Sequence, residues 1–221
     1  MTSPFGAGTT TTYNDAASPP TIVSTINGRW TRQTLDGVGR AVLTETGYGT
    51  TTVSQAETVY GPCGCSPLGK MIKQAVPHAP GAQPAYTVYS YDSIGRTTSV
   101  VAPDGASTTT YLYQGNTVTV TDAAGKWKKF TSDALGNLVQ VNEPNPAGGA
   151  DYVTSYTYDL LGHLTGVNMP RPTGTQTRSF VYSGNYLTSA TNSENGTVTY
   201  GGDSDEGNNV FRSEIDKDRS S

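Results

Sequence analysis

The chain has 221 residues and a formal net charge of −4, and only 14% of its residues are charged. This acidic balance excludes the basic footprint of a nucleic-acid-binding protein, and no apolar run approaches the roughly 18 residues of a membrane helix. The low share of charged residues argues against full disorder, which favours high net charge and few aromatics. Because Tyr and Thr favour strands, the composition indicates β structure around a thin core.

Residues 1–20 are rich in Thr, Ser, Pro and Gly, and they predict a flexible lead-in. The first residues have neither the basic stretch nor the hydrophobic stretch of a signal peptide. If the protein is exported, we expect the signal to lie elsewhere or the chain to be a fragment.

Short strands are expected from about residue 21, separated by Gly, Pro and Asn clusters, with a Pro-rich break at 77–84. Large residues alternate within them, as Tyr89 and Tyr91 do, and no helical stripe is present. The sequence therefore predicts an all-β fold of extended antiparallel repeats over residues 21–200. The expected strands are 30–35, 41–46, 52–60, 70–74, 86–91, 96–101, 107–113, 116–121, 126–131, 137–142, 152–158, 163–168, 177–182 and 197–200.

Residues 201–221 carry many charges, and they predict a polar, disordered tail. The run at 197–200 indicates the start of an unfinished repeat. Its open edge predicts a marginally stable chain that associates with itself.

One short phrase returns along the chain: an aromatic residue, Asp, two loose positions, Gly and a polar residue. It reads YDSIGR at 91–96 and YDLLGH at 158–163, with weaker copies LDGVGR at 35–40, SDALGN at 132–137 and DAAGK at 122–126. Degenerate copies are CSPLGK at 65–70, YQGN at 113–116 and YSGN at 182–185. The successive glycines lie 20 to 30 residues apart, which is typical of stacked repeats.

Asp and Gly have separate roles in such a phrase. Gly accepts the positive φ of a tight connection, and the Asp carboxylate accepts hydrogen bonds from backbone N–H groups two residues on. The predicted turn-forming structural residues are Asp36, Gly39, Asp92, Gly95, Asp133, Gly136, Asp159 and Gly162.

Catalysis is the alternative interpretation of the repeated aspartate carboxylates. A glycosidase needs two facing carboxylates, but the shared position of Asp36, Asp92, Asp122, Asp133 and Asp159 before xxG favours turn caps. His78 and His163 are expected to be exposed and not part of a Ser–His–Asp set. We expect no catalytic residue and no cofactor.

Cys63 and Cys65 lie in a turn-rich stretch and are the only cysteines. A metal site would need further soft ligands, so no metal is expected. Free or structural thiols are favoured over a local disulfide. The KWKKF run at 126–130 is expected to be a solvated edge strand, with a phosphate- or glycan-contacting patch as the alternative.

The repeats resemble the YD-repeat, or RHS, family. The resemblance rests on YSYDSIGR at 89–96 with PDG at 103–105 and TYLY at 110–113, and again on YTYDLLGHL at 156–164. The family includes bacterial RHS proteins, C components of insecticidal toxin complexes and teneurins. The resemblance implies antiparallel strands that spiral into a hollow or partial shell, often enclosing a C-terminal toxin domain. The family's Asp-based cleavage motif has no DPxG-like counterpart in the sequence.

We therefore expect a non-enzymatic, structural segment of a secreted or cell-surface bacterial protein. Its expected partners are further repeats and a C-terminal toxin domain of a longer parent chain, without nucleic acid or membrane insertion. The alternative is a carbohydrate- or partner-binding adhesin in which Trp30 and Trp127 stack on sugars.

Overall fold

The computed structural model describes residues 8–201 and 212–215, and all regular structure in that part of the chain is β-strand. The all-β prediction is confirmed. No helix of these residues is long and apolar enough to cross a membrane. The chain divides into two compact units, Met1–Tyr111 and Leu112–Ser221, which are described separately.

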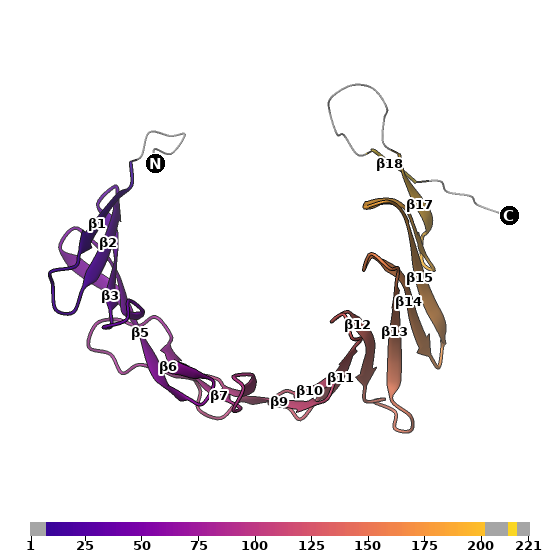
Figure 1. Cartoon of the computed structure of the whole chain (residues 1–221), viewed down its shortest axis with the longest axis horizontal. Coiled ribbons are helices and arrows are strands. Elements are labelled where there is room, and N and C mark those ends of the chain that lie inside the picture. Colours follow the sequence, from indigo (N-terminus) through magenta and orange to yellow (C-terminus); the bar gives the residue numbers. More distant parts are fainter. Residues whose placement is uncertain (1–7, 202–211, 216–221) are drawn as a thin grey trace. The chain divides into compact units, whose positions relative to one another are not determined.

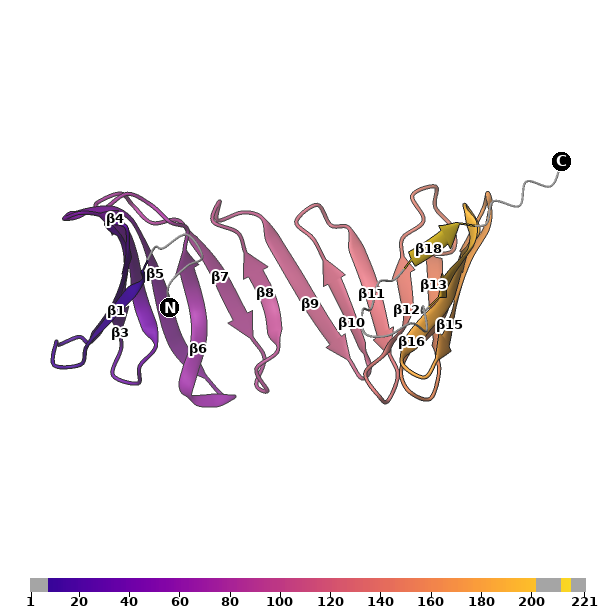
Figure 2. The same cartoon turned by 90° about the horizontal axis from the view of Figure 1, so that it is seen from above.

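In the first unit, successive strands pair antiparallel, each with the next along the chain (Figures 1 and 2). The last of them, β9, crosses the division between the units. The strands are β1 (Thr10–Asn14), β2 (Thr21–Ile26), β3 (Arg29–Leu35), β4 (Ala41–Tyr48), β5 (Thr51–Cys63), β6 (Ser66–Ala75), β7 (Tyr86–Tyr91), β8 (Thr97–Val101) and β9 (Thr108–Gln114).

The second unit repeats this arrangement, and β10, β11 and β12 lie side by side in Figure 2. The pairing continues antiparallel through the following strands. The strands are β10 (Thr117–Thr121), β11 (Trp127–Ser132), β12 (Leu138–Glu143), β13 (Tyr152–Tyr158), β14 (Leu164–Arg171), β15 (Gly174–Ser183), β16 (Tyr186–Asn192), β17 (Gly196–Gly201) and β18 (Arg212–Ile215).

The core is as thin as the composition predicts. Among the described residues the buried hydrophobic side chains are those of Ala75, Val141 and Ala190, and no large side chain is fully buried. Cross-strand rows replace a packed interior, as where Val118, Phe130 and Val141 face one another across β10, β11 and β12. Stability therefore depends on strand pairing and half-buried aromatics more than on a closed core.

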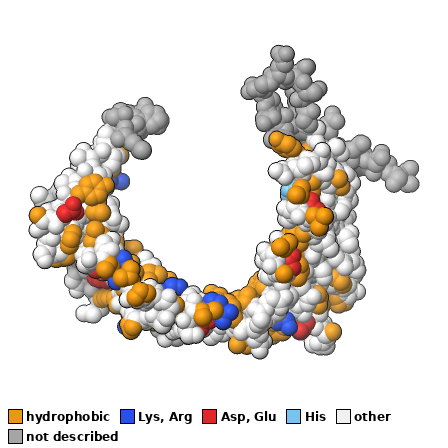
Figure 3. Space-filling model, in the orientation of Figure 1, with side chains coloured by type: hydrophobic (Ala, Val, Ile, Leu, Met, Phe, Trp, Pro, Cys, Tyr) orange, Lys and Arg blue, Asp and Glu red, His pale blue; other side chains and the backbone are white. Residues whose placement is uncertain are grey.

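Aliphatic side chains also lie exposed at the turns. The residue before the turn glycine is exposed in five copies of the phrase, and Figure 3 shows hydrophobic side chains (orange) at the surface of each unit. These residues are Val38, Leu68, Ile94, Leu135 and Leu161. Four of them lie at the tip of a tight turn, where no neighbouring strand covers them, whereas Leu68 lies within β6.

Four hairpins share a bulge that the sequence does not reveal. The register shifts by one residue at the strand end before the Asp, in β3, β7, β11 and β13. The turn glycine then has φ between 83° and 90°, at Gly39, Gly95, Gly136 and Gly162. This is the three-residue hairpin loop in which a left-handed residue forms a bulge.

Three parts of the chain differ from the sequence-based expectations. Within the expected lead-in, residues 10–14 form β1, because their backbone groups pair with β2 although every side chain is exposed. Within the expected tail, residues 212–215 form β18, which pairs with β17. The run at 197–200, expected to leave an open edge, therefore lies in a strand that pairs with both β16 and β18. The edge-strand prediction for residues 126–130 is wrong, since β11 pairs with both β10 and β12. The rest of the expected tail, after Gly201, and residues 1–7 lie outside the described residues.

Candidate functional site

The recurring turn is the feature that the chain repeats most faithfully. In each of the four best copies, one carboxylate oxygen of the Asp accepts hydrogen bonds from the backbone N–H groups two and four residues on. At Asp92 these donors are Ile94 and Arg96, at 3.1 and 2.9 Å. The same pair of bonds occurs at Asp36, Asp133 and Asp159.

The second carboxylate oxygen of each Asp is also occupied. It accepts a hydrogen bond from the side chain that follows the turn glycine, which is Arg40, Arg96, Asn137 or His163, at 2.7 to 3.0 Å. Backbone bonds close the loop on either side, as from Gly95 N–H to the Asp92 carbonyl oxygen at 3.0 Å. Both oxygens of each Asp are thus engaged within its own turn.

These bonds favour the ionised carboxylates. The backbone bond from Arg40 is the main cause that lowers the pKa of Asp36, and the side-chain bond from Asn137 does so for Asp133. At Asp92 and Asp159 burial acts in the opposite direction, but the bonds from Arg96 and His163 outweigh it, so the pKa is lowered there too.

A second set of contacts joins successive repeats at three copies of the phrase. In each of these, the side chain after the glycine lies over an aromatic ring 19 to 21 residues further on. Arg40 lies 4.0 Å from the ring centroid of Tyr60, and Lys70 lies 4.5 Å from that of Tyr91. His163 stacks on Tyr182 with centroids 4.6 Å apart. Such cation–π and stacking contacts attract because the ring face is electron-rich.

The aromatic residue before the Asp makes a further link, through its hydroxyl group. Tyr91 donates to the carbonyl oxygen of Met71 at 2.7 Å, and Tyr158 donates to that of Leu138 at 2.8 Å. Met71 and Leu138 each lie two residues after the glycine of a copy of the phrase, which is Gly69 within β6 and Gly136 in a turn. Burial raises the pKa of both hydroxyls. One repeat thus holds the backbone of its predecessor by a bond that recurs in both units.

The two tryptophans lie in different units. Trp30 donates its indole N–H to the carbonyl oxygen of Gly49 at 2.9 Å, and the guanidinium of Arg32 lies 5.4 Å from its ring centroid. These contacts occupy its N–H and part of its ring. Trp30 also lines a cavity of about 470 Å³ in the first unit.

Trp127 lies in the second unit and lines a cavity of about 390 Å³. The cavity combines aromatic and aliphatic surface with charged groups, and one of these, Lys128, pairs with Glu143 at 2.6 Å. The lining residues are Val120, Asp122, Lys126, Trp127, Lys128, Phe130, Glu143 and Pro144.

Neither histidine is exposed as the sequence predicts. The His78 side chain is 11% exposed and bonds to the Glu57 carboxylate at 2.8 Å. A backbone bridge between Gln55 and His78 brings them together. The His163 side chain is 20% exposed, because the ring lies between its own Asp159 and Tyr182. His163 is thus held by the Asp159 carboxylate of its own hairpin, and His78 is held by the Glu57 carboxylate beside the Gln55–His78 bridge.

Cys63 and Cys65 form a disulfide, where the sequence favours free thiols. Their Cα atoms lie 5.1 Å apart, within the range that a disulfide spans, because the turn between β5 and β6 folds them together. In the part of the chain that the structure describes, no group of three or more His, Cys, Asp or Glu residues could hold a metal ion.

No protein-family model and no curated protein matches the chain. Among solved structures, the chain is similar to the TcdB2–TccC3 crystal structure without its hypervariable C-terminal region, with a TM-score of 0.56 and 12% identity. The match covers 95% of this chain and 15% of that one. A Photorhabdus luminescens Tc holotoxin pore structure matches with a TM-score of 0.49 and 12% identity, over 88% of this chain and 14% of that one. The first likeness shows the fold.

Proposed function

We propose that the chain is a non-catalytic structural β-repeat segment of an RHS-like protein, part of a shell that encloses or displays a C-terminal toxin domain. The observation that carries the proposal is the contact, present at three copies of the phrase, between the side chain after the glycine and an aromatic ring of the next repeat. A repeat that can bury its aromatic ring only against its neighbour is the unit of a continuous wall.

The carboxylates support a structural role. A glycosidase would present two free carboxylates toward a common substrate position. Asp92 and Asp159 instead accept bonds on both oxygens from their own turns. Their pKa values are lowered, whereas a general acid at neutral pH needs a raised one.

The proposed partners are further repeats of a longer parent chain and its C-terminal toxin domain. The likeness to the TcdB2–TccC3 structure supports this, since the chain spans 15% of the length of the matched chain. The likeness to the TcdB2–TccC3 structure is also the basis on which we propose a secreted or cell-surface location.

The shell proposal predicts self-association. β1, paired with β2, begins the described pairing of the first unit, and β18, paired with β17, ends that of the second. Unpaired strand edges invite pairing with other chains. Light scattering coupled to size-exclusion chromatography should show a mean mass that rises with protein concentration. Thr12→Lys in β1 should reduce this rise, because an edge lysine blocks pairing, whereas Ser93→Lys in an exposed turn should not. A monomer at all concentrations that melts in one cooperative step would contradict the shell proposal.

Carbohydrate binding is the second candidate, and the cavity at Trp127 favours it. An aromatic ring beside paired charges is a surface on which a sugar ring can stack and form hydrogen bonds. Glycan-array binding that Trp127→Ala abolishes, with the melting temperature unchanged, would support an adhesin. Absence of glycan binding together with concentration-dependent association would favour the shell proposal over the adhesin.

A further inference from the structure

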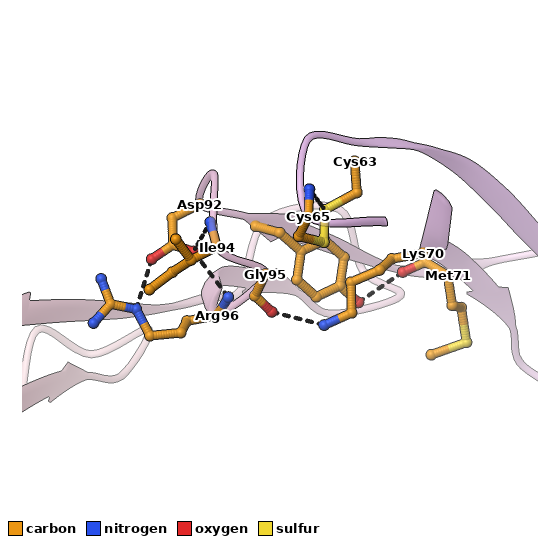
Figure 4. The surroundings of a disulfide bond; sticks show 9 residues. Cys63, Cys65, Lys70, Met71, Asp92, Ile94, Gly95 and Arg96 are labelled. Atoms are coloured by element: carbon orange, nitrogen blue, oxygen red, sulfur yellow. Dashed lines mark hydrogen bonds and ion pairs between the residues drawn. A yellow bond between two sulfur atoms is a disulfide. The ribbon is translucent and has the colours of Figure 1, made fainter. Parts of the chain in front are cut away.

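The turn between β5 and β6 is closed by a disulfide whose cysteines lie two residues apart (Figure 4). A disulfide restricts the unfolded chain more when it closes a longer loop, and this loop is among the shortest that can be closed. Both cysteines also belong to one hairpin, so the bond ties no distant strands together. Its effect must therefore be sought in the shape and chemistry of the turn itself.

The disulfide turn packs against the turn of the next repeat. A Cβ atom placed on Gly95 would lie 2.9 Å from Cys65 Sγ and 3.0 Å from Cys65 Cβ. The matching glycines of the second unit, Gly136 and Gly162, have φ of 90° and 83° but open space at the same position. The position of Gly95 thus requires glycine for two reasons, its positive φ and the close approach of the Cys65 sulfur. The positions of Gly136 and Gly162 require it only for their positive φ.

The surroundings of the two sulfurs favour thiolates. The Cys65 backbone N–H donates to Cys63 Sγ at 3.3 Å. Lys70 Nζ lies 3.6 Å from the point that a Cβ atom on Gly95 would occupy, which is the point that Cys65 Sγ also approaches. Lys70 Nζ donates a hydrogen bond to the Gly95 carbonyl oxygen at 2.6 Å. N–H donors and a nearby ammonium stabilise thiolates, and a better thiolate leaves faster in disulfide exchange. Both cysteines are half-exposed, and Gly64 between them is exposed.

We propose that Cys63-Gly64-Cys65 is a thiol–disulfide exchange site for low-molecular-weight monothiols, and that its state controls the packing of the β5–β6 turn on Gly95. A monothiolate attacks one Cys sulfur, the S–S bond breaks, and the other cysteine leaves as a thiolate. A second monothiolate then displaces the first as a disulfide. Two monothiols are oxidised to one disulfide, and the protein gains two thiols. The reduced Cys65 sulfur is no longer fixed against Gly95.

Native alkylation of the full chain tests the exchange. After incubation in glutathione buffers of increasing reducing power, iodoacetamide should label both cysteines of the folded chain, and mass spectrometry should detect a mixed disulfide with glutathione on the way. The unreduced chain should remain unlabelled. Labelling that requires prior unfolding would overturn the proposal.

A double-mutant cycle tests the control of packing. In the oxidised chain, Gly95→Ala should lower the folding equilibrium constant about tenfold more than Gly162→Ala, because only Gly95 faces a sulfur. In a Cys63→Ser/Cys65→Ser background the excess penalty at Gly95 should shrink, because the disulfide no longer holds the side chain at position 65 against Gly95. An unchanged excess at Gly95 would overturn the proposal, and so would equal penalties in the oxidised chain.

If Gly95→Ala fails to fold, amide hydrogen exchange of Ile94 and Arg96 in the wild-type chain replaces the mutant cycle. Exchange should be faster after reduction, with Leu161 and His163 unaffected as the internal control, and unchanged exchange would overturn the proposal.

Discussion

Gly47→Ala is expected to lower the free energy of unfolding by about 3 kcal/mol, near the upper end of the cost of overpacking. A Cβ atom on Gly47 would overlap the Trp30 ring and the Thr51 carbonyl oxygen, and the second of these is backbone that cannot rotate away. The hairpin of β4 and β5 would therefore have to open. Chemical denaturation followed by Trp fluorescence measures the change.

Gly49 supplies the matched control. It lies in the same hairpin and has φ of 58°, but nothing lies within 4 Å of its Cβ position. Gly49→Ala should therefore cost about 1 kcal/mol, the strain of a left-handed backbone alone. Equal costs at the two positions would show that Trp30 does not pack on Gly47. The part of the Trp30 ring that lies toward Gly47 would then be free, which would strengthen the adhesin alternative.

Stability should be greatest between about pH 4 and pH 6.5, and it should fall on both sides for different reasons. The turn aspartates have lowered pKa values in the folded chain, so their contribution is present above the ordinary value of about 3.9 and is lost as the pH falls below it. Hydrogen bonds from the following residues cause this at Asp36, Asp92, Asp133 and Asp159. They do so also at Asp104, in the turn at 103–105, whose carboxylate accepts bonds from the Ala106 and Ser107 N–H groups. Protonation removes acceptors from these turns together, so the acid loss should be steep.

The fall at higher pH should come from His78. Its bond to Glu57 raises its pKa above the ordinary 6.5, and it lowers that of Glu57 against the effect of burial. Stabilisation by His78 is therefore complete below about pH 6.5 and is lost as the pH rises through the raised value.

Urea denaturation at pH 3, 5.5 and 8 measures both limbs. His78→Gln should flatten the change between pH 5.5 and 8, and Asp159→Asn, which keeps an acceptor oxygen but cannot titrate, should shrink the change between pH 5.5 and 3. A wild-type chain equally stable at all three values would contradict both assignments.

The strands that the sequence predicts best are those with large alternating residues. In β15, Phe180 and Tyr182 are half-buried and Val181 between them is 55% exposed, as the alternation indicates. The sequence does not predict β16, because YLTSATN has small residues where a strand usually shows large ones, and its one buried side chain is Ala190. It does not predict β1 either, because TTTYN has no apolar face and its pairing depends on backbone bonds alone.

The contacts between repeats could not be predicted, because they depend on how one hairpin lies against the next. The spacing of about 20 residues between Arg40 and Tyr60, or His163 and Tyr182, was present in the sequence, but it has meaning only once the strand register is known. The same holds for His78 and Glu57, which a single backbone bridge at Gln55 brings together. Local chemistry within a turn can be derived from residue types, whereas packing between turns requires the backbone path.

Amide hydrogen exchange of the turn residues tests most directly whether the Asp–Gly phrase is a structural unit repeated along the chain. The backbone N–H groups that bond to the four Asp carboxylates are those of Val38, Arg40, Ile94, Arg96, Leu135, Asn137, Leu161 and His163. Five of these residues have exposed side chains at the surface of tight turns, where unbonded amides exchange at nearly the rate of an unfolded peptide. We expect all eight to be protected at pH 6, in the same pattern in each turn, and Asp159→Ala to remove protection from Leu161 and His163 alone. Exchange of the eight amides at unfolded-peptide rates in the wild-type chain would contradict the repeated capped turn and the scaffold built from it.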